Sequence, residues 1–161
     1  MDFGQASISV LNGMVSGFSA TLASLFNISV TPTDNNTVVV SVAGGVAHDS
    51  NGIGNSAAQF TIVYDSLLPH VALSPDPLPG TVSGPFSVSA NFTVAVVDFS
   101  AAKVSVGNGT VTGFSQQNGS NYTFTVTPAA QGTVTVEVPD GVVHSAANNA
   151  NVASNTLTTS Y

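Results

Sequence analysis

Few side chains in this sequence could carry chemistry, and their spacing decides which chemistry that would be. Eight carboxylates are spread over the chain, mostly in turn-like segments. Asp98, Glu137 and Asp140 could in principle supply a carboxylate pair of the kind that glycosidases use. Glu137 alternates with valines on both sides, however, so we expect it to face solvent from a strand. No serine lies in a Gly-x-Ser-x-Gly turn. The sequence therefore predicts no catalytic residue and no enzyme.

One acidic loop is the main candidate for a metal site. Asp49 and Asn51 could offer oxygens to Ca²⁺, and Asp65 could contribute from the junction that follows. Calcium takes six to eight oxygen ligands, and the Glu that ends an EF-hand loop is missing. A turn closed by the Asp side chain explains the same residues equally well. We therefore expect no cofactor, with calcium as a weak alternative.

Two histidines, His48 and His144, stand at equivalent points of an internal repeat described below. A zinc site needs three or four ligands. A single histidine per repeat, without cysteine or nearby carboxylates, does not supply them. We expect both histidines at loop edges, where they hydrogen-bond backbone groups.

Six asparagines lie in Asn-x-Ser/Thr sequons, the acceptor pattern for N-glycosylation. A chain so rich in Asn, Ser and Thr also produces sequons by chance. If the source organism glycosylates secreted proteins, some of these sites should carry sugar. The candidates are Asn27, Asn35, Asn91, Asn108, Asn118 and Asn121.

Charged side chains are too scarce for several classes of partner. They make up 6% of the chain, against about a quarter of an average soluble domain. Lys103 is the only basic residue, and the net charge is −7. Nucleic acids and anionic lipid headgroups both require clustered Lys and Arg, so we exclude both as partners.

Polar but uncharged residues must therefore keep the chain soluble. Surfaces rich in Ser, Thr, Asn and Gly are common on secreted and cell-surface proteins, and we predict an extracellular or cell-surface location. There is no cysteine and hence no disulfide framework. No run approaches the roughly 18 apolar residues of a membrane span, so we expect no membrane insertion. The first residues lack the basic and apolar regions of a signal peptide, so we expect either a mature fragment or a targeting segment outside the given sequence.

Apolar residues alternate with hydroxyl residues along most of the chain. Such alternation is typical of strands with one buried face, and it predicts antiparallel sheets packed face to face. Asn108-Gly109 is a hairpin-type turn signal. Glycine, proline and β-branched residues interrupt every window that could form a helix. The apolar faces of these strands are expected to contain Phe86, Val88, Ala90, Phe92, Val94, Tyr122, Phe124, Val126, Val134, Val136 and Val138.

The chain contains an internal duplication. When residue 2 is laid on residue 98, Gly17-Phe18-Ser19 meets Gly113-Phe114-Ser115, and Val30-Thr31-Pro32 meets Val126-Thr127-Pro128. One residue is lost near positions 52–55, after which Tyr64 falls on Tyr161. Only the second copy is preceded by a Pro-rich segment and a further strand. We predict a complete domain at 65–161 and, at 1–64, an incomplete one that lacks its first two strands.

Several stretches of the second copy carry a resemblance to a known family. They are Asp98-Phe-Ser, Val104-Ser-Val-Gly-Asn-Gly-Thr-Val-Thr-Gly-Phe114, Tyr122-Thr-Phe-Thr-Val-Thr-Pro128, Gly132-Thr-Val-Thr-Val-Glu-Val-Pro139 and Ala153-Ser-Asn-Thr-Leu157. These stretches resemble bacterial-type Ig-like tandem repeats, as in large adhesins and cell-surface fibre or stalk proteins. The resemblance covers residues 2–64 and about 66–161. It implies an all-β fold of tandem immunoglobulin-like sandwiches, antiparallel and of Greek-key type, with the first sandwich incomplete.

The resemblance also implies a function. Members of such arrays usually serve as stalks, spacers or fibre segments, so we expect a structural protein of an extracellular filament, stalk or surface array. The alternative is an adhesive or carbohydrate-binding module, although sugar binding favours exposed aromatic platforms and the chain has no Trp. The expected partners are neighbouring copies of the chain or flanking Ig-like repeats, and no surface ligand can be named.

The missing strands should leave one apolar wall of the first unit exposed to water. Two explanations are open. The strands precede Met1 in a longer array, or another subunit donates them by strand complementation. Head-to-tail complementation does not close on itself and would build a filament. The exposed wall is expected to contain Ile8, Val10, Phe26, Ile28, Val30, Val38, Val40 and Val42.

Overall fold

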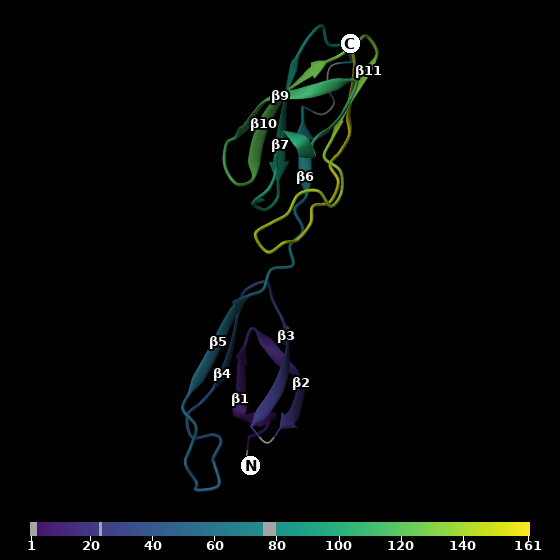
Figure 1. The fold of residues 1–161 in the computed structure, drawn as a ribbon. Coiled ribbons are helices and arrows are strands. Elements are labelled where there is room, and N and C mark those ends of the chain that lie inside the picture. The colour runs from purple at the N-terminus through teal and green to yellow at the C-terminus, as the bar shows by residue number, and fades with distance from the viewer. Residues whose placement is uncertain (1–2, 23, 76–79) are drawn as a thin grey trace. The chain divides into compact units, whose positions relative to one another are not determined.

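A computed structural model describes residues 3–22, 24–75 and 80–161 of the chain. These residues form strands β1 to β12 and two single-turn 3₁₀ helices, and no α-helix lies among them. The predicted all-β class is therefore correct. The chain divides into two compact units, Met1–Ser66 and Leu67–Tyr161 (Figure 1). That division lies close to the predicted boundary, whereas the interpretation of the first unit as an incomplete repeat stays a prediction.

The first unit consists of the 3₁₀ helix η1 and five strands. Strands β2 and β3 form one antiparallel sheet, and the other three form a second antiparallel sheet in the order β1-β4-β5. In Figure 1, β4 and β5 run side by side, and the loop of residues 43–57 projects from their shared end. The bounds are η1 (Gln5–Ser7), β1 (Ile8–Leu11), β2 (Gly13–Leu22), β3 (Leu25–Pro32), β4 (Thr37–Val42) and β5 (Ala58–Val63).

The second unit repeats this order and adds two strands in front of it. One sheet has the order β6-β7-β10-β9, and the other has the order β12-β11-β8. Strands β8 to β12 therefore pair as β1 to β5 do, and β6 and β7 have no counterpart in the first unit. The bounds are β6 (Val71–Ser74), β7 (Phe86–Phe92), η2 (Ala101–Lys103), β8 (Ser105–Gly107), β9 (Gly109–Gln116), β10 (Asn121–Pro128), β11 (Thr133–Glu137) and β12 (Leu157–Ser160).

The Asn-Gly pairs at 12–13 and 108–109 carry the chain from one sheet to the other. Asn12 and Asn108 have φ angles of 57° and 56°, in the left-handed region that Asn tolerates better than most residues. A Cβ atom on Gly109 would lie 2.9 Å from the carbonyl oxygen of Thr127, so only glycine fits there without rearrangement. The predicted hairpin at Asn108-Gly109 is wrong, because β8 pairs with β11 and β9 pairs with β10.

The second unit has a closed hydrophobic core between its two sheets. Alternation places the apolar side chains inside and the hydroxyl side chains outside, as the sequence predicts. Phe92, Phe99, Phe114, Tyr122 and Phe124 form a chain of ring contacts with centroids 5.0–6.3 Å apart. The fully buried side chains include Leu73, Val88, Phe124, Val126, Val134, Val136, Val138, Val143 and Leu157.

The first unit has no such closed core. Among its described apolar residues, Val38 alone is buried. Ile28, Phe60 and Ile62 are 36%, 62% and 52% exposed, whereas Phe124 and Leu157, which match Ile28 and Phe60, are both 1% exposed. Of the eight residues predicted for the exposed wall, Ile28 is exposed, Val38 is buried and the other six are half-buried, so the wall is less exposed than the sequence predicts.

One asparagine in each unit organises the long loop before the last strand. The Oδ1 atom of Asn151 accepts hydrogen bonds from two successive amides, and its Nδ2 group donates to two carbonyls. Asn55 makes the same four kinds of bond in the first unit. The two residues therefore match without a shift, so the one-residue offset lies after Ser56 and not near 52–55. The expected position of the offset was wrong because the sequence does not show the backbone hydrogen bonds by which Asn55 and Asn151 match.

Candidate functional site

Asp98 is the centre of the main charged cluster that the structure reveals. Its Oδ1 atom accepts a hydrogen bond from the backbone amide of His144 at 2.7 Å, and its Oδ2 atom lies 3.0 Å from Nδ1 of the same residue. Lys103, at the end of η2, donates its ammonium group to the same Oδ2 atom. The three side chains are about one-third exposed. The cluster therefore connects η2 to the loop that follows β11.

Hydrogen bonding stabilises the ionised form of Asp98. Burial alone would raise its pKa, but the bonds from Lys103 and from the amide and ring of His144 outweigh burial and hold the pKa at about 2. The negative charge also adds to burial in raising the pKa of Tyr122. All of these contacts are made within the domain, so the cluster acts as a clamp on a loop.

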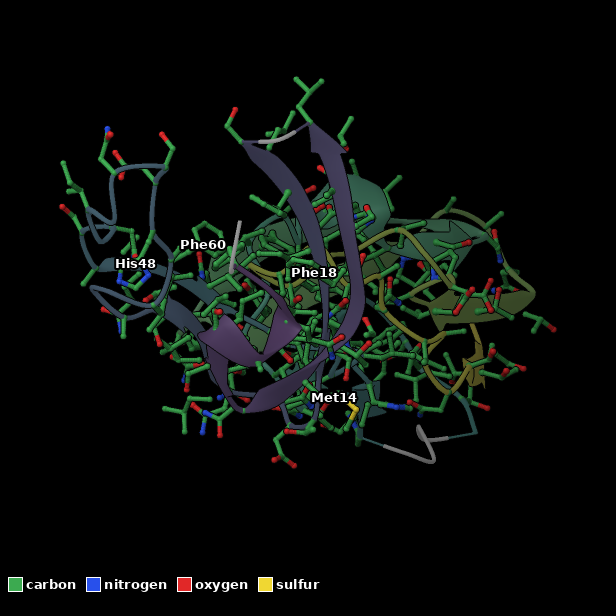
Figure 2. The ribbon with its side chains drawn as sticks, turned by 90° about the horizontal axis from the view of Figure 1, so that it is seen from below. Met14, Phe18, His48 and Phe60 are labelled. Atoms are coloured by element: carbon green, nitrogen blue, oxygen red, sulfur yellow. The ribbon has the colours of Figure 1, made fainter. Side chains whose placement is uncertain are left out.

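The expectation that His144 has no nearby carboxylate is wrong. Asp98 and His144 are distant in sequence, and only the fold brings them together. A signal was nevertheless present, because Asp2 and His48 recur as Asp98 and His144 in the duplicated alignment. Asp2 lies outside the described residues. His48 lies in the loop of residues 43–57, apart from Met14 and Phe18 on β2 (Figure 2).

The other predicted acidic candidates have separate surroundings. Glu137 accepts a hydrogen bond from the hydroxyl of Thr156 on a neighbouring segment at 3.2 Å, whereas Asp98 is bound to His144 and Lys103. Asp140 is exposed. Within residues 3–22, 24–75 and 80–161, no group of three or more His, Asp and Glu side chains could hold a metal ion.

The predicted calcium residues do not all come together. Asp49 closes a tight turn, because its Oδ1 atom accepts bonds from the amides of Asn51 at 2.8 Å and Ile53 at 2.9 Å. These two amides lower the pKa of the Asp49 carboxyl. Asp65 follows the far end of β5, a strand that spans about 20 Å. The turn explanation therefore has direct support, and calcium binding at Asp49 and Asn51 stays a prediction.

The six sequon asparagines differ in how accessible they are. Asn27, Asn35, Asn91 and Asn118 are exposed, whereas Asn108 and Asn121 are half-buried. The Nδ2 group of Asn108 donates to the carbonyl of Ala130, and that of Asn121 donates to Oδ1 of Asn118. Exposure thus favours the first four as acceptors. Glycosylation itself stays a prediction.

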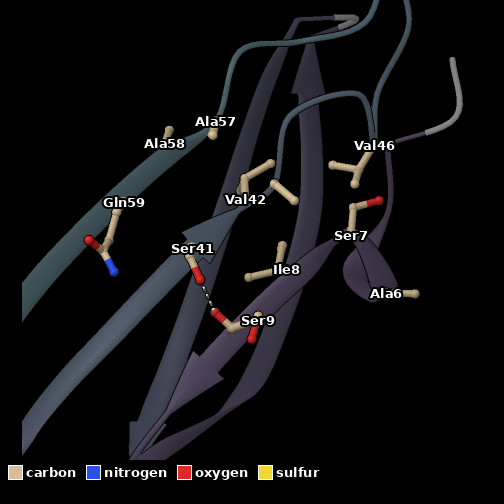
Figure 3. Close-up of a pocket in the computed structure, with 11 residues that line it drawn as sticks. Ala6, Ser7, Ile8, Ser9, Ser41, Val42, Val46, Ala57, Ala58 and Gln59 are labelled. Atoms are coloured by element: carbon tan, nitrogen blue, oxygen red, sulfur yellow. Dashed lines mark hydrogen bonds between the residues drawn. The ribbon is translucent and has the colours of Figure 1, made fainter.

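A hollow of about 490 Å³ lies beside β1 and the start of β5 in the first unit (Figure 3). Its lining consists of Ala, Ser, Ile, Val and Gln side chains, without an ionisable group. The hydroxyl of Ser41 donates to the carbonyl of Ser9 at 3.5 Å across its floor. With no acid, base or nucleophile activated by a neighbour, this hollow offers no catalytic chemistry.

The most distinctive feature of the first unit is an apolar groove of about 310 Å³ between its two sheets. We call it the open groove. Phe60, which lies on β5, is 62% exposed at its rim (Figure 2). No charged side chain lines it. The lining residues are Ile28, Val30, Pro32, Val38, Val40, Phe60 and Ile62.

Both rims of the open groove are strand edges. Within the described part of the chain, β3 pairs only with β2, and β5 pairs only with β4. Each strand therefore presents a row of backbone groups on the side that faces the groove, and such edges readily pair with another strand. The open groove thus combines an apolar floor with two hydrogen-bonding rims.

The second unit shows what closes the equivalent groove. Strand β7 pairs antiparallel with β10 on one side. The segment before it binds along β12 on the other side, where the amide of Val82 donates to the carbonyl of Ser160 at 2.8 Å. Asn155 also bonds to both backbone groups of Leu73. The sequence predicts a first unit without these two strands, but it does not predict that two strand edges are open.

Comparisons with known proteins bear on the second unit. A family model described as "Bacterial Ig-like domain" matches residues 65–161, which is more than half of the chain and includes β6 to β12. No curated protein matches the chain. In the described residues there is no helix long and apolar enough to cross a membrane.

Proposed function

The chain belongs to the bacterial Ig-like domain family, and from this membership we propose that it is a structural segment of an extracellular filament, stalk or surface array. Domains of this family are typically non-catalytic modules with a surface or structural role, and they are usually extracellular. The proposal goes further in assigning the chain to an assembly. The open groove of the first unit is the observation that carries this step.

The open groove favours assembly because it is costly in isolation. Ile28, Phe60 and Ile62 stay more than one-third exposed, and apolar surface contributes about 25 cal/mol for each Å² removed from water. Covering these side chains with a further strand would therefore stabilise the first unit. Two open strand edges would gain hydrogen-bond partners in the same step.

Strand complementation between neighbours would link such units into an array. A donated strand provides main-chain hydrogen bonds for affinity and alternate side chains for specificity. A donor and an acceptor surface at different places on a molecule form a heterologous contact, which continues into a filament unless its rotation closes a ring. Neighbouring copies or flanking Ig-like repeats are the partners that this arrangement requires.

The scarcity of reactive groups is consistent with a structural role. The only basic side chain of the chain, that of Lys103, is engaged by Asp98. The hollow of about 490 Å³ in the first unit is lined by methyl, hydroxyl and amide groups. Most polar contacts organise loops and turns, as Asn151 and Asp49 do.

Immunogold electron microscopy of intact cells tests the proposed function. An antibody against the second unit should label extracellular fibres or stalks at a regular spacing. Labelling confined to the cell interior would contradict the proposal, and so would label scattered over the surface without a regular array. A preimmune serum serves as the control.

A further inference from the structure

The register of β7 in the second unit defines what the open groove of the first unit can bind. In that register Phe86 lies opposite Val126, Val88 lies opposite Phe124, and Ala90 lies opposite Tyr122. These three side chains of β10 are buried. Every second residue of β7 thus points into the core, and the residues between point outward.

The alignment of the two repeats shows which residues of β3 correspond to these residues of β10. Val126, Phe124 and Tyr122 correspond to Val30, Ile28 and Phe26. Ile28 and Val30 line the open groove. Phe26 belongs to a ring cluster with Phe3 and Phe18, at centroid distances of 4.8 and 5.6 Å. The acceptor surface for a β7-type strand is therefore already assembled.

Strands β6 and β7 together form one side of their sheet. The order β6-β7-β10-β9 places β6 and β7 together at one side, so removing them leaves β9 and β10 paired. The first unit has this arrangement, since β2 and β3 are paired without them. A strand can therefore add at the β3 edge without breaking a pair that already exists.

We propose that the open groove binds, in trans, an extended strand of a neighbouring polypeptide with the β7 pattern. The strand lies antiparallel to β3, with uncharged apolar residues opposite Val30, Ile28 and Phe26 and polar residues between them. This inference rests on the proposed function, because it names the donor chemistry for the link between neighbours. Within this chain β7 is engaged by β10, so the donor is a strand not engaged in its own sandwich.

Fluorescence anisotropy with a labelled peptide of residues 84–95 and the full chain tests the proposal. We expect saturable binding to the wild-type chain. The peptide with Val88→Asp should bind at least about tenfold more weakly, because a carboxylate would be buried against Ile28. This control leaves the protein itself unchanged.

Two lysine substitutions on β3 form a matched pair. Ile28→Lys places a charge in the open groove and should weaken the peptide at least about tenfold. Ser29→Lys places the same charge on the opposite face of the strand and should change binding less than about twofold. Adding the peptide to the wild-type chain should shift the NMR signals of the backbone amides of residues 26–30.

Three results would overturn the proposal. They are the absence of binding, equal binding by the Ile28→Lys and Ser29→Lys chains, and amide shifts confined to the second unit, which would indicate exchange with its own β7.

A further result would show whether the donor strand belongs to the same chain or to a neighbour. If residues 84–97 stabilise the first unit only when joined ahead of Asp2, the donor acts in cis and the trans link is wrong. The immunogold experiment does not depend on peptide binding. Regular labelling together with no peptide binding would therefore refute the strand-binding inference and leave the proposed function standing.

Discussion

Asp98 and His144 are joined twice, by the backbone amide of His144 to Oδ1 at 2.7 Å and by its ring nitrogen 3.0 Å from Oδ2. The first contact uses the main chain, so it depends on the loop conformation and not on the charge of the imidazole. Lys103 binds the same carboxylate. Asp98 therefore adds side-chain contacts between two segments that also meet through the main chain, where the amide of Val97 donates to the carbonyl of His144 at 3.0 Å.

Replacing Asp98 by asparagine should destabilise the second unit. Asp98→Asn removes the charge that Lys103 and His144 bind, and we expect the free energy of unfolding at pH 7 to fall by about 1–2 kcal/mol, allowing for solvent screening. Urea unfolding followed by NMR signals of the second unit measures this change. Asp140→Asn, on an exposed turn, is the control and should be nearly neutral. Equal stability of the two variants would show that the clamp contributes nothing.

Acid should remove the same contribution from the wild-type chain. The pKa of Asp98 is lowered from its ordinary 3.8 to about 2 in the folded state. The stabilisation is thus complete above about pH 4 and is lost as the pH falls toward 2. Unfolding free energies measured across this range should decline less steeply for Asp98→Asn than for the wild type. Parallel curves for the two chains would contradict the assignment.

Matched valines should differ in what they contribute to each unit. Val136 is fully buried on β11, whereas Val40, its counterpart on β4, is half-buried beside the open groove. Val136→Ala should cost about 2 kcal/mol, and Val40→Ala should cost less than about 1 kcal/mol. Denaturant unfolding followed by NMR signals of each unit measures the two losses of stability separately. A larger loss from Val40→Ala would show that the first unit has a closed core in solution.

The two loop asparagines provide a second matched pair. Asn151 is 2% exposed and satisfies four backbone groups, so Asn151→Ala should cost about 3 kcal/mol or more. Asn55 makes equivalent bonds but is half-buried, so water can replace some of them and Asn55→Ala should cost about 1 kcal/mol. Thermal unfolding, followed separately for each unit, measures both losses of stability. Equal losses would indicate that solvent does not reach the Asn55 loop.

Removing the Asp49 carboxylate should loosen its turn. In Asp49→Ala the amides of Asn51 and Ile53 lose their acceptor and should exchange with solvent faster, whereas Asp49→Asn retains an acceptor oxygen. Hydrogen exchange measured by NMR gives the comparison. The amide of Asn151 in the second unit, which donates to the carbonyl of Val143 at 2.8 Å, is the internal reference. Unchanged exchange in Asp49→Ala would show that the loop is held elsewhere.

The sequence predicts the strands because their signal is local. Alternation along β10 places Tyr122, Phe124 and Val126 inside without reference to any other part of the chain, and all three are buried. The duplication then indicates which strands the first unit lacks. The exposed rims of the open groove follow from that absence once the sheet order is known.

Contacts between distant residues could not be predicted in the same way. Asp98 and His144 meet only because β7, η2 and the loop after β11 converge, and neither residue has a local pattern that names the other. The turn at Asn108-Gly109 has a hairpin composition, yet the pairing of β8 with β11 decides the path of the chain. Nothing in the sequence indicates that Asn151 organises its loop, except that the same residue recurs as Asn55 in the first copy.

The segment that closes the second unit also decides how that unit would carry a mechanical load. His70 bridges Val152 and Thr81 bridges Ser160 in parallel, so the two ends of the unit leave these contacts in opposite directions. Tension between Leu67 and Tyr161 would therefore load the bridges in shear, and several hydrogen bonds would have to break together. Within the described residues, β5 has no such parallel neighbour. An array under tension would yield first at its uncomplemented units, and each donated strand would raise the force that the array withstands.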